Sequence, residues 1–212
     1  MTSYKLNVIN KSELDRPIFA LFAKLPQTSD YDSLHTAWLT QQVDTGNRYS
    51  FTWDVAWGLA WSAQGIGKGV RWTAGNELTA DPNSTAKSAA RLDYDGDFTL
   101  DFVPGTPTGD TLTVTDTGKV PLRSVKPSSI GVTLDGNVAC VTNAGPNLTQ
   151  TFTLHPTYFI DAGNYVQGQM VDGSSATTYQ ELEFAGGVTE LTVTLNPDNT
   201  WTFGSVDAPK AA

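Results

Sequence analysis

The sequence predicts an all-β fold, an antiparallel β-sandwich with one long surface loop rich in proline, threonine and glycine. Apolar residues alternate with polar ones in many short runs, and the 3.6-residue period of helices is almost absent. Glycine, proline and asparagine turns separate these runs. With 212 residues, of which 39% are apolar, the chain can bury a core as a single domain over residues 1–212 without disulfides or metal ions.

The N-terminal quarter contains four predicted strands. Alternation predicts the first over residues 4–9, and an apolar run after Pro17 predicts the second over 18–23. Two further strands, 38–43 and 49–53, flank a four-residue polar stretch that contains a glycine. That spacing favours a hairpin between them.

The register of a second predicted hairpin follows from the rule that apolar residues must face apolar residues across the turn. A three-residue loop over 95–97 pairs Tyr94 with Phe98, whereas a two-residue loop would pair the tyrosine with an aspartate. Near the C-terminus, an alternating strand ends at the turn sequence 196–199, and the chain returns over 201–203.

The same test around residues 135–137 predicts another three-residue loop, which pairs Leu134 with Val138 and Val132 with Cys140. This register turns Cys140 inward, as an inert buried thiol. Because it is the single cysteine of the chain, an internal disulfide and a cysteine-based zinc site are both excluded.

Residues 103–129 contain four prolines and many threonines and glycines, interrupted by a short predicted strand at 112–114. We interpret this segment as a long surface loop, the kind of element that carries recognition on a rigid scaffold. A domain boundary is the alternative.

The net charge of −9 argues against nucleic-acid binding, because the averaged field repels phosphate backbones. The longest apolar runs are too short for a transmembrane segment. The N-terminal sequence lacks the pattern of a cleaved secretion signal. We therefore expect the protein to be cytoplasmic or to be exported without a cleaved signal peptide.

Five of the six tryptophans lie within 35 consecutive residues. If residues 53–61 were one extended segment, Trp53, Trp57 and Trp61 would share a face. That face would either pack in the core, which we favour, or form an exposed aromatic platform for a glycan or a lipid headgroup. A second aromatic set near residue 163 could rim a pocket. The candidate ligand-binding residues are Trp57, Trp61, Trp72, Tyr158 and Tyr165.

The acidic residues Asp93, Asp95 and Asp97 are candidate ligands for a weakly bound calcium ion, since calcium prefers oxygen ligands. The favoured alternative is a solvated hairpin tip, and no other cofactor is predicted. The two histidines, His35 and His155, have no nearby signature of a nucleophile. We therefore expect no enzymatic activity.

Several segments, in the same order along almost the whole chain, resemble the RhiA-type, rhizosphere-induced proteins of bacteria. The resemblance implies a protein of plant-associated bacteria expressed under quorum control, and it carries over no catalytic residues. It departs at residues 62–67 and in the loop 103–129. The strand that ends in Asn-Lys-Ser is also distantly similar to aegerolysin-like β-sandwich cytolysins. The segments that carry the RhiA resemblance are 4–12, 37–39, 49–54, 80–83, 152–160, 163–168 and 195–202.

These observations favour a noncatalytic β-sandwich that recognises a cell-surface or extracellular ligand, with a carbohydrate as the favoured class. One alternative is a membrane-lipid-binding, aegerolysin-like toxin component. The other is a structural protein that self-associates into a homo-oligomer through sheet edges and apolar faces.

Overall fold

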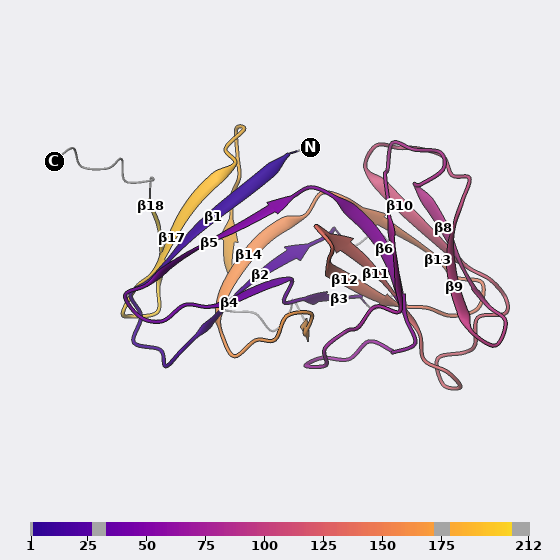
Figure 1. Cartoon of the computed structure of the whole chain (residues 1–212), viewed down its shortest axis with the longest axis horizontal. Helices are drawn as coiled ribbons and strands as arrows, with labels where there is room; N and C mark the ends of the chain where they lie inside the picture. The colour runs from indigo at the N-terminus through magenta and orange to yellow at the C-terminus, as the bar shows by residue number, and fades with distance from the viewer. Residues whose placement is uncertain (1, 27–32, 172–178, 205–212) are drawn as a thin grey trace.

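The computed structural model describes residues 2–26, 33–171 and 179–204, and their regular secondary structure consists of strands. These strands form four sheets, numbered here in roman numerals (Figure 1). Sheet I has the order β18 (Trp201–Gly204), β17 (Glu190–Leu195), β1 (Ser3–Asn10), β5 (Arg48–Asp54). Sheet II has the order β16 (Gln180–Leu182), β14 (Thr157–Gly163), β2 (Ile18–Lys24), β4 (Leu39–Gln42). Sheet III has the order β15 (Met170–Val171), β3 (Ser33–Thr36), β12 (Asn137–Asn143), β11 (Ser129–Leu134), β6 (Trp57–Ser62), β7 (Asn76–Thr79). Sheet IV has the order β13 (Thr149–Thr153), β10 (Thr111–Asp116), β8 (Ala89–Tyr94), β9 (Phe98–Val103).

The all-β prediction is confirmed, and the packed sheets are consistent with a β-sandwich. Neighbouring strands pair antiparallel, except that β1 pairs with β17, and β8 with β10, in parallel. Figure 1 shows sheets I and IV at opposite ends of the molecule.

One buried apolar cluster contains side chains from every sheet, among them Leu6 of sheet I, Leu59 of sheet III and Leu92 of sheet IV. Sheets I and II meet through aromatic rings. The ring centroids of Trp53 and Tyr158 lie 5.2 Å apart in this contact. Such pairs contribute stability beyond their buried area, so this contact helps to hold sheets I and II together.

Most of the predicted strands are present. The first two correspond to β1 and β2. Tyr94 pairs with Phe98 across the three-residue loop, as predicted. Leu195 pairs with Trp201 across the C-terminal turn, which also confirms that hairpin. The expected short strand at 112–114 lies within β10, which is paired on both sides in sheet IV.

The predicted hairpin between residues 38–43 and 49–53 is wrong. Both strands form, but β4 pairs with β2 in sheet II, whereas β5 pairs with β1 in sheet I. The connection between them therefore crosses from one sheet to another. The alternation of apolar residues satisfies the burial of each strand without specifying which neighbour it pairs with.

The predicted three-residue loop at 135–137 is also wrong, although Val132 does pair with Cys140. Asp135 and Gly136 have φ values of 51° and 71°, so they form a two-residue turn, and Leu134 pairs with Asn137. A β-bulge between Val132 and Thr133 then shifts the register by one residue, so that Val132 pairs with Cys140 as predicted. Cys140 is buried, as predicted, with 4% of its surface exposed.

The three tryptophans at four-residue spacing do not lie on one strand. Trp53 belongs to β5, whereas Trp57 and Trp61 belong to β6 of a different sheet. Tyr158, a candidate ligand-binding residue, lies in β14 and is buried. Four of the five tryptophans that lie within 35 consecutive residues are at most 8% exposed. The favoured interpretation, packing in the core, therefore holds for most of them.

Candidate functional site

Three of the five candidate ligand-binding residues are core residues. Trp57, Trp72 and Tyr158 are 8%, 4% and 7% exposed. Trp61 and Tyr165 are half-buried; the Tyr165 hydroxyl donates a hydrogen bond of 2.5 Å to Asp161 Oδ2. Of the five, Trp72 lines a surface hollow of about 410 Å³ that we call the Trp72 pocket. The structure does not bring the other four to this pocket.

The Trp72 pocket lies where the segment before β7 meets the β11–β12 turn and the segment before β15. Its walls combine two indoles with polar side chains from these three stretches of sequence. The lining residues are Trp38, Arg71, Trp72, Thr73, Ala74, Glu77, Thr133, Gly136, Asn137, Val138, Gln167 and Gly168.

Both indoles of the pocket are held by hydrogen bonds within the core. Trp72 Nε1 donates to Ser129 Oγ at 2.8 Å, and Trp38 Nε1 donates to the Leu134 carbonyl at 2.8 Å. Gly131 makes the position of Trp72 possible, because a Cβ there would lie 2.7 Å from the indole Cη2 atom. The two rings are therefore fixed beneath the pocket with their N–H groups already used, and because Trp38 is fully buried and Trp72 is 4% exposed, a ligand can reach no more than an edge of Trp72.

The hydrogen-bonding capacity of the Trp72 pocket comes from its polar rim. Gln167 Nε2 donates to Asn137 Oδ1 at 2.7 Å, and Thr133 Oγ1 donates to Glu77 Oε1 at 2.6 Å. Arg71 is exposed at the mouth. The rim thus offers a guanidinium, a carboxylate and two amides, which together can donate to and accept from adjacent hydroxyl groups.

Sequence reasoning missed these rim residues. Arg71 is the neighbour of the candidate residue Trp72, and Asn137 belongs to the predicted hairpin loop 135–137. Glu77 and Gln167 stand in no motif, and only the folded arrangement brings them to the same place.

A second polar surface covers the outer face of sheet I, on the side away from the core. Lys5, Asn7 and Ile9 of β1 alternate with buried residues and point outward. The hollow above them has a volume of about 410 Å³. We call it the strand-face groove; its lining residues are Lys5, Asn7, Ile9, Lys11, Arg48, Tyr49, Ser50, Glu190, Thr192, Thr194 and Gly204.

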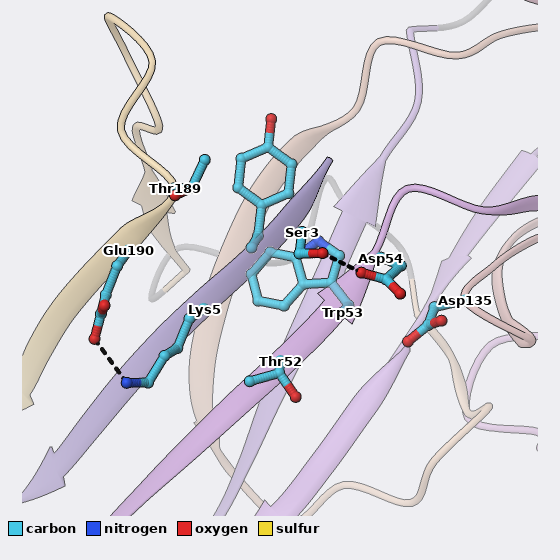
Figure 2. Close-up of a pocket in the computed structure, with 9 residues that line it drawn as sticks. Ser3, Lys5, Thr52, Trp53, Asp54, Asp135, Thr189 and Glu190 are labelled. Carbon is cyan, nitrogen blue, oxygen red and sulfur yellow. Dashed lines mark hydrogen bonds and ion pairs between the residues drawn. The ribbon is translucent and has the colours of Figure 1, made fainter. Parts of the chain in front are cut away.

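Figure 2 shows the hollow that continues the strand-face groove toward the start of β1; the two share Lys5 and Glu190. Lys5 Nζ lies 2.8 Å from Glu190 Oε1, and Ser3 Oγ donates a hydrogen bond to Asp54. The hydrogen bonds from Lys5 and then Asn7 hold the pKa of Glu190 below its usual range. Asp135 reaches the same hollow from the β11–β12 turn (Figure 2).

The acidic hairpin is a solvent-facing turn. Asp95 and Asp97 are exposed, and Asp93 accepts a hydrogen bond of 2.5 Å from Thr117 Oγ1, which lowers the Asp93 pKa. Within residues 2–26, 33–171 and 179–204, no group of three or more histidine, cysteine, aspartate or glutamate side chains is placed to hold a metal ion. The geometry gives the calcium prediction no support.

Comparison with known proteins decides the family. The RhiA family model matches residues 1–205. The chain is also 32% identical over 206 residues to "Protein RhiA" of Rhizobium leguminosarum bv. viciae, a match that covers 94% of this chain and 85% of that protein. The chain belongs to the RhiA family. No solved structure matches it significantly.

In this RhiA-family chain the two histidines lie apart from both polar hollows. His155 is exposed, and its Nε2 atom is 3.7 Å from Asp110 Oδ2. His35 is buried in β3, where it pairs with Cys140 of β12. Neither lines the Trp72 pocket or the strand-face groove. Among the residues described, no helix could cross a membrane.

Proposed function

We propose that this RhiA-family protein is noncatalytic and recognises a carbohydrate at a cell surface or in the extracellular medium through the Trp72 pocket. The observation that carries the proposal is the polar rim of the pocket, formed by Arg71, Glu77, Asn137 and Gln167 above two indoles that are fixed in the core. Planar guanidinium, carboxylate and amide groups can pair with the adjacent hydroxyl groups that a sugar presents around its edge.

The proposal assigns no chemistry to the pocket. Glu77 is the one carboxylate among its lining residues, and no histidine or cysteine accompanies it. A paired acid and base, or a nucleophile beside a base, is the usual requirement for hydrolysis. Recognition by shape and hydrogen bonding needs only the guanidinium, carboxylate and amide groups that line the pocket.

A glycan array run beside a liposome panel tests the proposed function. We expect the purified protein to be retained on a set of glycans and to ignore protein-free lipid. Sedimentation with liposomes and no retention on glycans would favour the membrane-lipid alternative. A defined oligomer by light scattering, with neither ligand bound, would favour the structural alternative.

The proposed ligand lies outside the cell, so the proposal requires the protein to leave the cytoplasm. Fractionation of producing cells into cytoplasm, envelope and medium measures this. Detection of the protein in the cytoplasm alone would contradict an extracellular ligand.

A further inference from the structure

We propose that the strand-face groove is a second binding site, separate from the Trp72 pocket, and that its ligand is an anionic polysaccharide. No residue lines both hollows, so the two proposals stand on different side chains. The groove's shape, its hydrogen bonds and its charge each contribute to the argument.

The pairing of sheet I arranges the groove in rows across three strands. Asn7 of β1 pairs with Ser50 of β5 and with Thr192 of β17. The next outward row contains Ile9, Arg48 and Thr194. A rise of about 3.3 Å per residue places the Lys5 row about 13 Å from the Arg48 row, so the groove is long enough for several sugar units.

Hydrogen bonds fix the middle of the groove. Ser50 Oγ donates to Asn7 Oδ1 at 2.6 Å, and Asn7 Nδ2 donates to Glu190 Oε1 at 2.8 Å. The neutral polar side chains that line the groove carry hydroxyl groups and one amide, which suit the hydroxyl groups of a polysaccharide. A strand face held in this way is largely preorganised for a ligand, which lowers the entropic cost of binding.

The charge of the groove is opposite to that of the whole protein. Three cations line it against the single carboxylate of Glu190, on a chain of net charge −9. Lys5 already pairs with Glu190. Within the described part of the chain, no ion pair joins Lys11 or Arg48 to a carboxylate. These two cations are exposed and open to an external anion.

The combination of cations and hydroxyl groups in the groove favours an acidic polysaccharide over a nucleic acid. Two exposed cations suit the carboxylates of an acidic sugar chain, and the hydroxyl and amide groups beside them suit its hydroxyl groups, whereas a nucleic acid presents mainly phosphates and base edges. Glu190, Asp54 and Asp135 surround the adjoining hollow (Figure 2). The anionic groups should therefore bind at the Lys11 and Arg48 end.

The test measures binding of polygalacturonate to the full chain by titration calorimetry at low and high salt. We expect the double variant Lys11→Gln/Arg48→Gln to bind about tenfold more weakly than wild type, the loss expected from two exposed charge contacts. Added salt should weaken wild-type binding by a similar factor. The matched control Lys24→Gln/Arg123→Gln removes two exposed cations outside the groove and should bind like wild type.

Two comparison ligands make the result specific. Methyl-esterified polygalacturonate, which lacks the charge, should bind much more weakly than the free acid. Equal binding of the two polymers would overturn the proposal, as would unchanged binding by the groove variant. Binding to phosphatidylglycerol vesicles without binding to polygalacturonate would overturn it in favour of a membrane surface. Because Arg71→Ala leaves the groove intact, it should retain polygalacturonate binding whatever the fate of the Trp72 pocket.

Discussion

The replacement Gly131→Ala tests how Trp72 is held in place. A methyl group at residue 131 would lie 2.7 Å from Cη2, 3.1 Å from Cζ2 and 3.2 Å from Cζ3 of the Trp72 ring. The contacted atoms belong to a rigid ring that is 4% exposed, so the indole must move as a unit. That movement strains its hydrogen bond to Ser129 Oγ.

The expected loss of stability combines three effects. Overpacking costs about 1–3 kcal/mol, and weakening a buried hydrogen bond costs about 1 kcal/mol. The lower entropy of the unfolded alanine chain offsets about 0.4–1 kcal/mol. We therefore expect Gly131→Ala to reduce the free energy of unfolding by about 2 kcal/mol, a net of these contributions.

Urea unfolding followed by circular dichroism measures this difference. Gly67→Ala is the matched control, because its nearest contact, Val70 Cγ2 at 3.6 Å, is an ordinary van der Waals distance. The control should be within about 0.5 kcal/mol of wild type. A Gly131→Ala protein as stable as the control would refute the account of how Trp72 is packed.

Three further predictions concern other parts of the fold. Burial raises the pKa of Asp116 from 3.8 to about 6. The folded state therefore binds a proton on the Asp116 carboxylate more tightly than the unfolded state does. The stability gained from this protonation is fully present below pH 3.8 and is lost as the pH rises through about 6. Asp116→Asn should be more stable than wild type at neutral pH by up to about 3 kcal/mol, and this difference should vanish at acidic pH. Urea unfolding of both proteins across this pH range measures the difference, and a difference that does not change with pH would contradict the prediction. Burial also raises the pKa of the Cys140 thiol to about 12, so Ellman's reagent should react with it in denaturant and not in the native protein. Gly136→Ala should cost about 1 kcal/mol, because residue 136 has a positive φ, whereas Asp135→Asn should be neutral in the same unfolding assay.

Local pairing could be predicted from the sequence wherever side-chain alternation and a short turn act together. The loop between Tyr94 and Phe98 is such a case, because only one register faces apolar residues toward each other. The β11–β12 turn shows where this reasoning fails. Asp135 adopts a left-handed conformation that allows a two-residue turn in place of the predicted three-residue loop. The bulge between Val132 and Thr133 absorbs the one-residue change in register.

Long-range partners could not be predicted, because alternation specifies a buried face and not a neighbouring strand. The pairing of β1 with β17 joins residues nearly the whole chain apart. The same limit applies to the candidate site. Trp72 was selected for its residue type, but Glu77 and Gln167 become its neighbours only when three separate segments meet.

The most direct test of the proposed function is a calorimetric titration with a glycan that the array retains. Arg71→Ala/Gln167→Ala removes two exposed rim groups of the Trp72 pocket, and Arg123→Ala/Gln41→Ala removes the same residue types elsewhere. We expect the first variant to lose at least about tenfold in affinity, the effect of one or two lost hydrogen bonds to charged or amide groups, while the second binds like wild type. Equal affinity of both variants and wild type would contradict recognition through the Trp72 pocket.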